Sequence, residues 1–145
     1  MIKNTCTDEE TKLNIYTLKK FTKVRHRINR LEYEVINKGG VTVSQYDVLM
    51  VLYHNGDLKV GDIMEKTLTT PGNITVVINN LERDGLVKRI RDTEDKRAIN
   101  ISITDKGINI IKKIIPKHTE IINKILNGLD VKEKIILQDI LDKME

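Results

Sequence analysis

Residues 60 to 97 read VGDIMEKTLTTPGNITVVINNLERDGLVKRIRDTEDKR, and this stretch decides the fold. Its first part, about residues 59 to 68, predicts a short helix because apolar side chains recur at helical spacing. These apolar residues are Val60, Ile63, Met64 and Leu68. A helix of this length is not stable alone and must pack on its neighbours, as the first helix of a helix-turn-helix does.

The second part predicts a helix over residues 71 to 84 with clear ends. Thr70 can act as the N-cap, Pro71 suits the first helical position, and Gly85 suits a left-handed stop. At ~100° per residue, one face is apolar and consists of Ile74, Val77, Ile78 and Leu81. The opposite face is small, polar and nearly uncharged, and consists of Gly72, Thr75, Val76, Asn79 and Arg83.

This outer face has the chemistry that reading DNA requires. The N-terminal end of a recognition helix enters the major groove, where its free N–H groups and positive dipole suit phosphate. The small or hydrogen-bonding residues at that end are Thr70, Gly72, Asn73 and Thr75. Asn73 or Asn79 could bond adenine with two hydrogen bonds, and Val76 could contact a thymine methyl group. The alternative is that these residues only cap and solvate a core helix.

The third part alternates in the manner of strands over residues 86 to 91 and 98 to 103, and therefore predicts a two-stranded hairpin. Between residues 83 and 97 there are six basic residues against four acidic ones. A guanidinium at the hairpin tip can enter a narrow minor groove, and a nearby carboxylate can hold it in position. The candidate contacts are Arg91, Asp95, Lys96 and Arg97. A solvated turn is the alternative.

Further helices are expected on both sides of this stretch. Ser44 is the expected N-cap of the helix that precedes it. Thr104 should cap the helix that follows it, and Pro116 should kink that helix because proline removes a backbone hydrogen bond. Asp130 and Glu133 form a capping-box start for a last helix.

The terminal helices, about residues 8–37 and 104–145, predict an assembly. Both carry long apolar stripes, and the stripe of the first consists of Leu18, Phe21, Val24, Ile28, Leu31 and Val35. The lobe between them, about residues 44–103, is too small to cover two long helices completely. Burial against a second copy would solve this, so we predict a two-fold symmetric homodimer. Packing within one chain is the alternative.

The 145 residues read as a single domain, residues 1–145, without repeats or linkers. The formal charge of +4 mildly favours an anionic partner. A basic run without acidic residues occupies the first helix and consists of Lys19, Lys20, Lys23, Arg25, Arg27 and Arg30. A solvated face, phosphate contact and contact with an acidic partner all remain open for this run.

Several classes of protein do not fit the sequence. There is no phosphate-binding glycine loop, nucleophile elbow or clustered acid-base set, so an enzyme is not expected. The three histidines His26, His54 and His118 match no local metal-ligand motif, so no metal or cofactor is expected. Without a membrane-spanning run or a signal peptide, and with Cys6 as its single cysteine, the chain predicts a cytoplasmic protein without membrane contact.

These features together resemble the winged helix-turn-helix of the MarR family of bacterial transcriptional regulators. The specific marks are GNITVVINNLERDGLV, the DTEDKR loop, the ITDKG that opens the following helix, and IIPKH beyond it. The resemblance is close over about residues 44 to 118. It implies a mainly α fold with a small β-hairpin, in which a winged helix-turn-helix is flanked by N- and C-terminal dimerisation helices.

The resemblance also implies a function. Residues 71 to 84 would be the recognition helix of a homodimer on a palindromic operator in double-stranded DNA, with Pro71 among the groove and phosphate contacts. Arg97 would enter the minor groove, positioned by Asp95. Members of the family usually repress genes and release DNA when a small phenolic or otherwise aromatic effector, or an oxidant, acts near the junction of the two parts.

The sequence does not name the effector, the operator or the sign of regulation. Candidate pocket residues are His26, Tyr33, Tyr46 and Tyr53, although core packing explains tyrosines on helix faces equally well. The oxidant-sensing branch of the family uses a cysteine within the first helix. Cys6 lies ahead of the predicted helix, which argues against a thiol switch.

Overall fold

The structure, a computed structural model, describes residues 8–67, 69–92 and 98–144. The described chain is mainly helical with a small antiparallel sheet. The helices are α1 (Glu9–Lys38), α2 (Val43–Asn55), α3 (Val60–Thr67), α4 (Pro71–Arg83), α5 (Asp105–Leu126) and α6 (Val131–Asp142). The strands are β1 (Leu58–Lys59), β2 (Val87–Arg91) and β3 (Ile99–Ile103).

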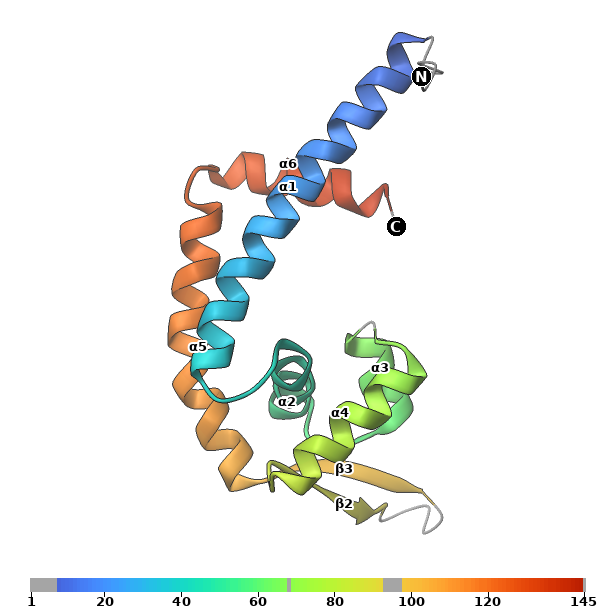
Figure 1. Ribbon diagram of the computed structural model, residues 1–145, viewed down its shortest axis with the longest axis vertical. Helices are drawn as coiled ribbons and strands as arrows, with labels where there is room; N and C mark the ends of the chain where they lie inside the picture. The colour runs from blue at the N-terminus through green and yellow to red at the C-terminus, as the bar shows by residue number, and fades with distance from the viewer. Residues whose placement is uncertain (1–7, 68, 93–97, 145) are drawn as a thin grey trace, which may run out of the picture.

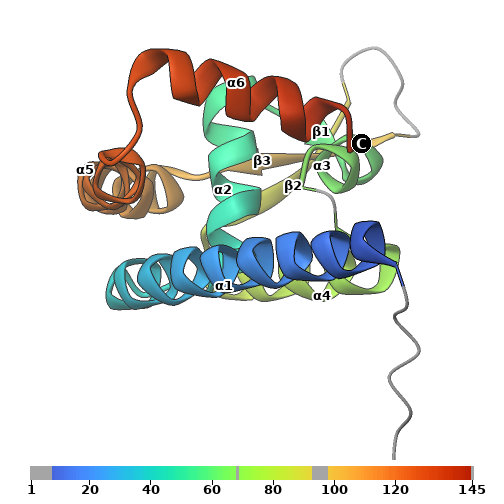
Figure 2. The same cartoon turned by 90° about the horizontal axis from the view of Figure 1, so that it is seen from above.

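The molecule has two parts (Figure 1). Helices α2, α3 and α4 and the sheet form a lobe at one end, while α1 and α5 leave the lobe together and then diverge, and α6 connects the far end of α5 to a position where, in this view, it crosses α1 partway along its length. Figure 2 shows the same arrangement from above, with α1 and α6 on opposite sides of the view. Within the described part of the chain, no helix combines the length and apolar character needed to cross a membrane.

The sheet has three strands in the order β1-β3-β2, so the expected two-stranded hairpin was incomplete. Strands β2 and β3 pair antiparallel from Val87 with Ile103 to Arg91 with Ile99. The extra strand β1 is only two residues long and pairs Leu58 with Ile101. A strand of two residues is too short to show the alternation of apolar and polar side chains by which strands are predicted, so the sequence pattern did not reveal β1.

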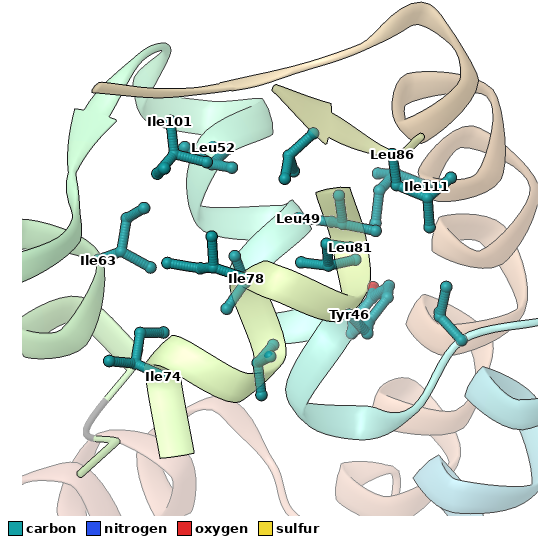
Figure 3. Close-up of a cluster of buried hydrophobic side chains, with 14 of the residues drawn as sticks. Tyr46, Leu49, Leu52, Ile63, Ile74, Ile78, Leu81, Leu86, Ile101 and Ile111 are labelled. Atoms are coloured by element: carbon teal, nitrogen blue, oxygen red, sulfur yellow. The ribbon is translucent and has the colours of Figure 1, made fainter. Parts of the chain in front are cut away.

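The core of the lobe is aliphatic except for Tyr46, and it joins all the helices of the lobe to the sheet and to α5 (Figure 3). The four residues predicted for the inner face of the second helix, Ile74, Val77, Ile78 and Leu81, are all buried. The largest completely buried side chains around them include Leu49, Leu52, Ile63, Ile101 and Ile111. The predicted helical spacing is therefore confirmed for α4.

Helix ends agree with the sequence in some places and correct it in others. Helix α2 begins two residues earlier than expected, because Thr42 and Gln45 form the capping box and Ser44 lies inside the helix. The capping box of Asp130 and Glu133 is confirmed for α6. Helix α5 continues through Pro116 to Leu126.

Candidate nucleic-acid interface

The outer face of α4 is a band of exposed, mostly uncharged side chains. Its exposed members are Gly72, Asn73, Thr75, Val76, Asn79 and Arg83. Val76 is 57% exposed, so its methyl groups lie on the outer face of α4. Thr75 donates its hydroxyl to the carbonyl of Pro71 at 3.1 Å, so its hydroxyl proton is already used within the helix.

The N-terminus of α4 is open. Thr70 stands at the N-cap position in an extended conformation, but its hydroxyl makes no capping hydrogen bond, contrary to the sequence prediction. Pro71 has no N–H, and the N–H groups of the following residues in the first turn have no acceptor within the helix. Thr70 and Asn73 have no side-chain partner among the described residues, so both remain available to an outside ligand.

Asn79 differs from Asn73 because its amide is already held. Arg89 on β2 donates from Nη2 to Oδ1 of Asn79 at 2.7 Å. The same guanidinium forms an ion pair through Nη1 with the carboxylate of Glu82, one turn further along α4. Helix α4 is therefore joined to the sheet by a polar contact at its exposed edge as well as by the buried core.

The base of the hairpin is held by a backbone and a side-chain contact. The N–H of Asp92 donates to the carbonyl of Ala98 at 3.0 Å, and Nδ2 of Asn100 donates to a carboxylate oxygen of Asp92 at 2.8 Å. Arg91 is exposed at the end of β2. The predicted wing residues Asp95, Lys96 and Arg97 lie outside the described residues, as does Cys6.

Thr104 connects the sheet to the start of α5. Its hydroxyl accepts from the N–H of Gly107 at 3.2 Å, as predicted for an N-cap, and donates to the carbonyl of Gly85 at 2.8 Å. Its own N–H donates to the carbonyl of Leu86 at 3.0 Å. Lys106 reaches the carbonyl of Asp84 at 2.7 Å. The end of α4 is thus attached directly to the long helix that leaves the lobe.

A three-residue chain of hydrogen bonds spans the junction between the two parts. Nδ1 of His118 on α5 lies 3.1 Å from the hydroxyl of Tyr46 on α2, and its Nε2 lies 3.0 Å from the carboxylate of Glu32 on α1. Because an ionised carboxylate only accepts, Nε2 of His118 carries a proton while Glu32 is charged. The contacts join residues 72 and 86 positions apart, and no local pattern in the sequence predicts them.

Beside this chain is an open hollow of about 330 Å³ between α2, α3 and α5. Its lining residues are Tyr46, Asp47, Met50, Val51, Lys66, Thr67 and His118. Of the four predicted pocket residues, only Tyr46 lies here. Tyr33 and His26 are exposed on α1, and Tyr53 packs its ring edge-to-face on His54. The structure therefore does not bring the four residues together.

Partial burial raises the pKa of the Asp47 carboxyl, nearby Glu32 raises it further, and His118 acts in the opposite direction. Burial, Asp47 and Glu32 likewise raise the pKa of Tyr46. A folded-state pKa above the unfolded value means that protonated Asp47 favours folding at low pH. That contribution is lost as the pH rises from about 3.8 through the raised folded-state pKa.

We therefore expect Asp47→Asn to raise the free energy of unfolding at pH 7 more than at pH 4. The gain should stay below about 1 kcal/mol because the side chain keeps contact with solvent. Urea unfolding at both pH values measures it, with Asp57→Asn on the exposed turn after α2 as the control for removal of a charge. An equal change at both pH values would contradict the assignment of this effect to the Asp47 charge.

All the residues of the basic run on α1 are exposed, and the run lies far from the strands of the hairpin (Figure 1). Lys23, His26, Arg27 and Arg30 surround a shallow hollow with Val24, and the ammonium of Lys20 stands over the ring of Tyr16 at 5.2 Å. Solvation, phosphate contact and an acidic partner all remain compatible with this arrangement. Among the described residues there is no group of three or more side chains able to hold a metal ion.

Helices α2 and α3 support α4, whose polar face is exposed beside the basic hairpin of β2 and β3. This arrangement defines a winged helix-turn-helix DNA-binding protein. The MarR family profile matches residues 39–98 of the chain. The uncharacterized HTH-type transcriptional regulator YkoM of Bacillus subtilis (strain 168) is 31% identical over 125 residues, which are 86% of this chain and 80% of the relative. The chain belongs to the MarR family of transcriptional regulators, and is a DNA-binding protein without enzymatic activity.

Solved structures agree with this fold. MarR from E. coli, a cysteine-to-serine variant in complex with operator DNA, has a TM-score of 0.81 at 19% identity, covering 95% of this chain and 99% of that one. BpsR from Bordetella bronchiseptica, whose DNA binding is regulated by 6-hydroxynicotinic acid, has a TM-score of 0.77 at 21% identity, covering 89% of this chain and 98% of that one. These likenesses concern the fold alone.

Proposed function

We propose that this regulator is a ligand-responsive repressor that binds a palindromic operator as a homodimer. The single observation that carries the proposal is the outer face of α4, where uncharged groups that can bond base edges are exposed beside an open helix N-terminus. Two such helices, related by a two-fold axis, would occupy successive major grooves about 34–36 Å apart. A dimer bound in this way would exclude polymerase from an overlapping promoter.

The uncovered helices support the dimer. None of the residues of α6 is buried, and large apolar side chains are exposed on both terminal helices. On α1 these are Leu13, Ile15, Tyr16, Leu18, Phe21, Val24 and Tyr33, and from α6 onward they are Val131, Ile135, Ile136, Leu137, Ile140 and Met144. Apolar side chains exposed together along two helices are typical of a protein interface. A second copy would bury it.

The wing contact rests on the sequence. We propose that Arg97 enters the minor groove, that Asp95 holds the Arg97 side chain in position, and that Arg91 and Lys96 lie near the phosphates. The paired strands and the hydrogen bond between Asp92 and Asn100 support this proposal by providing a fixed base for the loop.

Binding to DNA is tested by fluorescence anisotropy with a duplex selected by the protein from a random-sequence pool. The logarithm of the binding constant should fall linearly with the logarithm of the salt concentration, because phosphate contacts release counterions. A winged helix that serves only protein contacts would select no sequence and show no such slope.

Asn73→Ala should lower the preference for the selected duplex over random DNA by on the order of 1–3 kcal/mol, because Asn73 is exposed and unpaired near the groove-facing end of α4. Competition binding measures this difference. Asn14→Ala near the start of α1 is the matched control and should change neither affinity. Equal losses on both DNAs would show that Asn73 does not read bases.

We further propose that the hollow between α2, α3 and α5 takes the effector. Lys66 offers a cation, Tyr46 a hydroxyl, and Met50 with Val51 an apolar wall, which together suit a small aromatic acid or phenol. A ligand here would touch helices of both parts of the molecule and the end of α3, which packs on α4. It could therefore change how the two recognition helices are spaced.

With 6-hydroxynicotinic acid as the probe, we expect DNA affinity to fall as the probe concentration rises. Lys66→Gln should shift the half-effect concentration at least about fivefold upward, because the charge-assisted contact to the carboxylate is lost. Lys112→Gln, on the exposed surface of α5, is the matched control. If Lys66→Gln and the unchanged protein have the same half-effect concentration, Lys66 does not contact the probe.

A further inference from the structure

The contact between Arg89, Asn79 and Glu82 decides which hydrogen-bonding groups the recognition helix offers. Arg89 comes from β2, and its two terminal nitrogens bond two side chains that lie three residues apart on α4. The side chains of Arg89 and Glu82 are only about one-third exposed, at 35% and 37%. The contact is therefore more enclosed than a freely solvated surface pair.

The direction of the Asn79 amide follows from the chemistry of Arg89. A guanidinium has five N–H donors and no acceptor, so it can bond only the oxygen of an amide. The 2.7 Å contact thus turns Oδ1 of Asn79 towards β2 and leaves Nδ2 pointing away from it. Asn79 belongs to the exposed face that also carries Val76, so its NH2 group is what that face presents.

The four bases differ in whether their major-groove edges can accept a hydrogen bond from the outward NH2 group of Asn79. Guanine presents two acceptors there, adenine presents N7, and thymine presents O4, whereas cytosine presents only an N4 amino donor. A freely rotating asparagine can bond adenine with both its oxygen and its nitrogen. An asparagine whose oxygen is already bonded can donate but meets cytosine donor against donor.

We propose that Arg89 is a positioning residue that makes Asn79 a donor-only reader, so that each half-site has one base position at which cytosine is rejected. The inference rests on the proposed function, since it requires α4 to lie in the major groove. It also gives Arg89 a role other than phosphate contact. Its charge is paired with Glu82, so it adds little to the electrostatic attraction for DNA.

The test uses the duplex selected from a random pool and all its single-base substitutions, measured by competition anisotropy. With the unchanged protein, cytosine at one position per half-site should weaken binding about tenfold relative to the best base there. Asn79→Ala should abolish that penalty. Arg89→Met should reduce it to about twofold or less, because the amide can then turn its oxygen outward, and should leave the salt slope unchanged.

Two further variants keep the test decisive if Arg89→Met does not fold. Arg89→Lys retains a donor and should preserve part of the cytosine penalty, and Glu82→Gln loosens the guanidinium and should lower the penalty without removing Asn79. The double variant Asn79→Ala/Arg89→Met should show the same base profile as Asn79→Ala alone, because the two residues act through one contact.

Several outcomes would overturn the inference. Uniform weakening on all duplexes in the Arg89 variants, with the cytosine penalty intact, would make Arg89 merely structural. A salt slope smaller by about one would make Arg89 a phosphate contact. A base profile that ignores Asn79 would also refute it. If the unchanged protein selects no sequence at all, the proposed function fails instead, which separates the two results.

Discussion

Replacing Gly107 by alanine should lower the free energy of unfolding by about 2–4 kcal/mol. A Cβ at this position would stand 2.4 Å from the carbonyl oxygen of Leu86 and 2.8 Å from Cγ1 of Ile103. The first of these is a backbone atom, so the clash cannot be relieved by turning a side chain. Relief requires α5 to move away from the sheet.

The carbonyl of Leu86, which the added Cβ would displace, also accepts a hydrogen bond from Thr104. The N–H of Thr104 donates to Leu86 O at 3.0 Å, and its hydroxyl holds the N–H of Gly107 itself. Separation of α5 from the sheet would therefore weaken the N-cap of α5 as well as the packing. Loss of such a cap typically costs about 1 kcal/mol, which contributes to the expected total.

Urea unfolding at a fixed protein concentration measures this change, since the stability of a dimer depends on concentration. Gly61→Ala is the matched control, because a Cβ there meets nothing within 4 Å and Gly61 also lies in the first turn of a helix. That variant should be neutral or more stable by up to about 1 kcal/mol. A Gly107→Ala protein as stable as the unchanged one would show that the approach of α5 to Leu86 is not tight.

The variant Ile136→Glu/Ile140→Glu should be monomeric at micromolar concentration and should bind the selected duplex at least about 100-fold more weakly. Both isoleucines are about half exposed, at 56% and 48%, on a helix that buries no residue within one chain. Charges at these positions would have to be desolvated in a dimer interface, which is costly. In a dimer, binding of one subunit holds the other close to the second half-site. A monomer lacks this gain in effective concentration and binds each half-site independently.

Sedimentation velocity gives the assembly state, and anisotropy gives the affinity. Gln138→Glu adds one negative charge, where the double variant adds two, to the same helix ~200° around it from both isoleucines, and should remain a dimer. The circular dichroism of the double variant should stay helical, because the lobe core does not include α6. A double variant that sediments as a dimer would rule out α6 as part of the interface.

The helix-turn-helix could be predicted from the sequence because its signals are local. Pro71 and Gly85 stand at positions where each favours a helix boundary, and the structure places α4 at Pro71–Arg83 with a positive φ of 72° at Gly85. The inward and outward faces of α4 follow from the helical period alone. Each of these properties depends on residues no more than a few positions apart.

The errors occurred where two local choices were nearly equal. Thr42 and Ser44 can both cap a helix, and the decision depends on Gln45, which stands three residues after Thr42 and returns the hydrogen bond. Thr70 occupies the N-cap position of α4, yet its hydroxyl makes no capping bond. Residue type alone does not distinguish an available cap from a used one.

The sequence by itself determined the family, the order of helices, the buried face of α4 and the exposed face that we expect to meet DNA. Only the tertiary structure decided that β1 completes the sheet through Ile101, that His118 joins Tyr46 to Glu32, and that Arg89 holds the amide of Asn79. The physical reason is range. Helical period and capping act within about one turn, whereas these contacts join different elements and exist only once the core has brought those elements together.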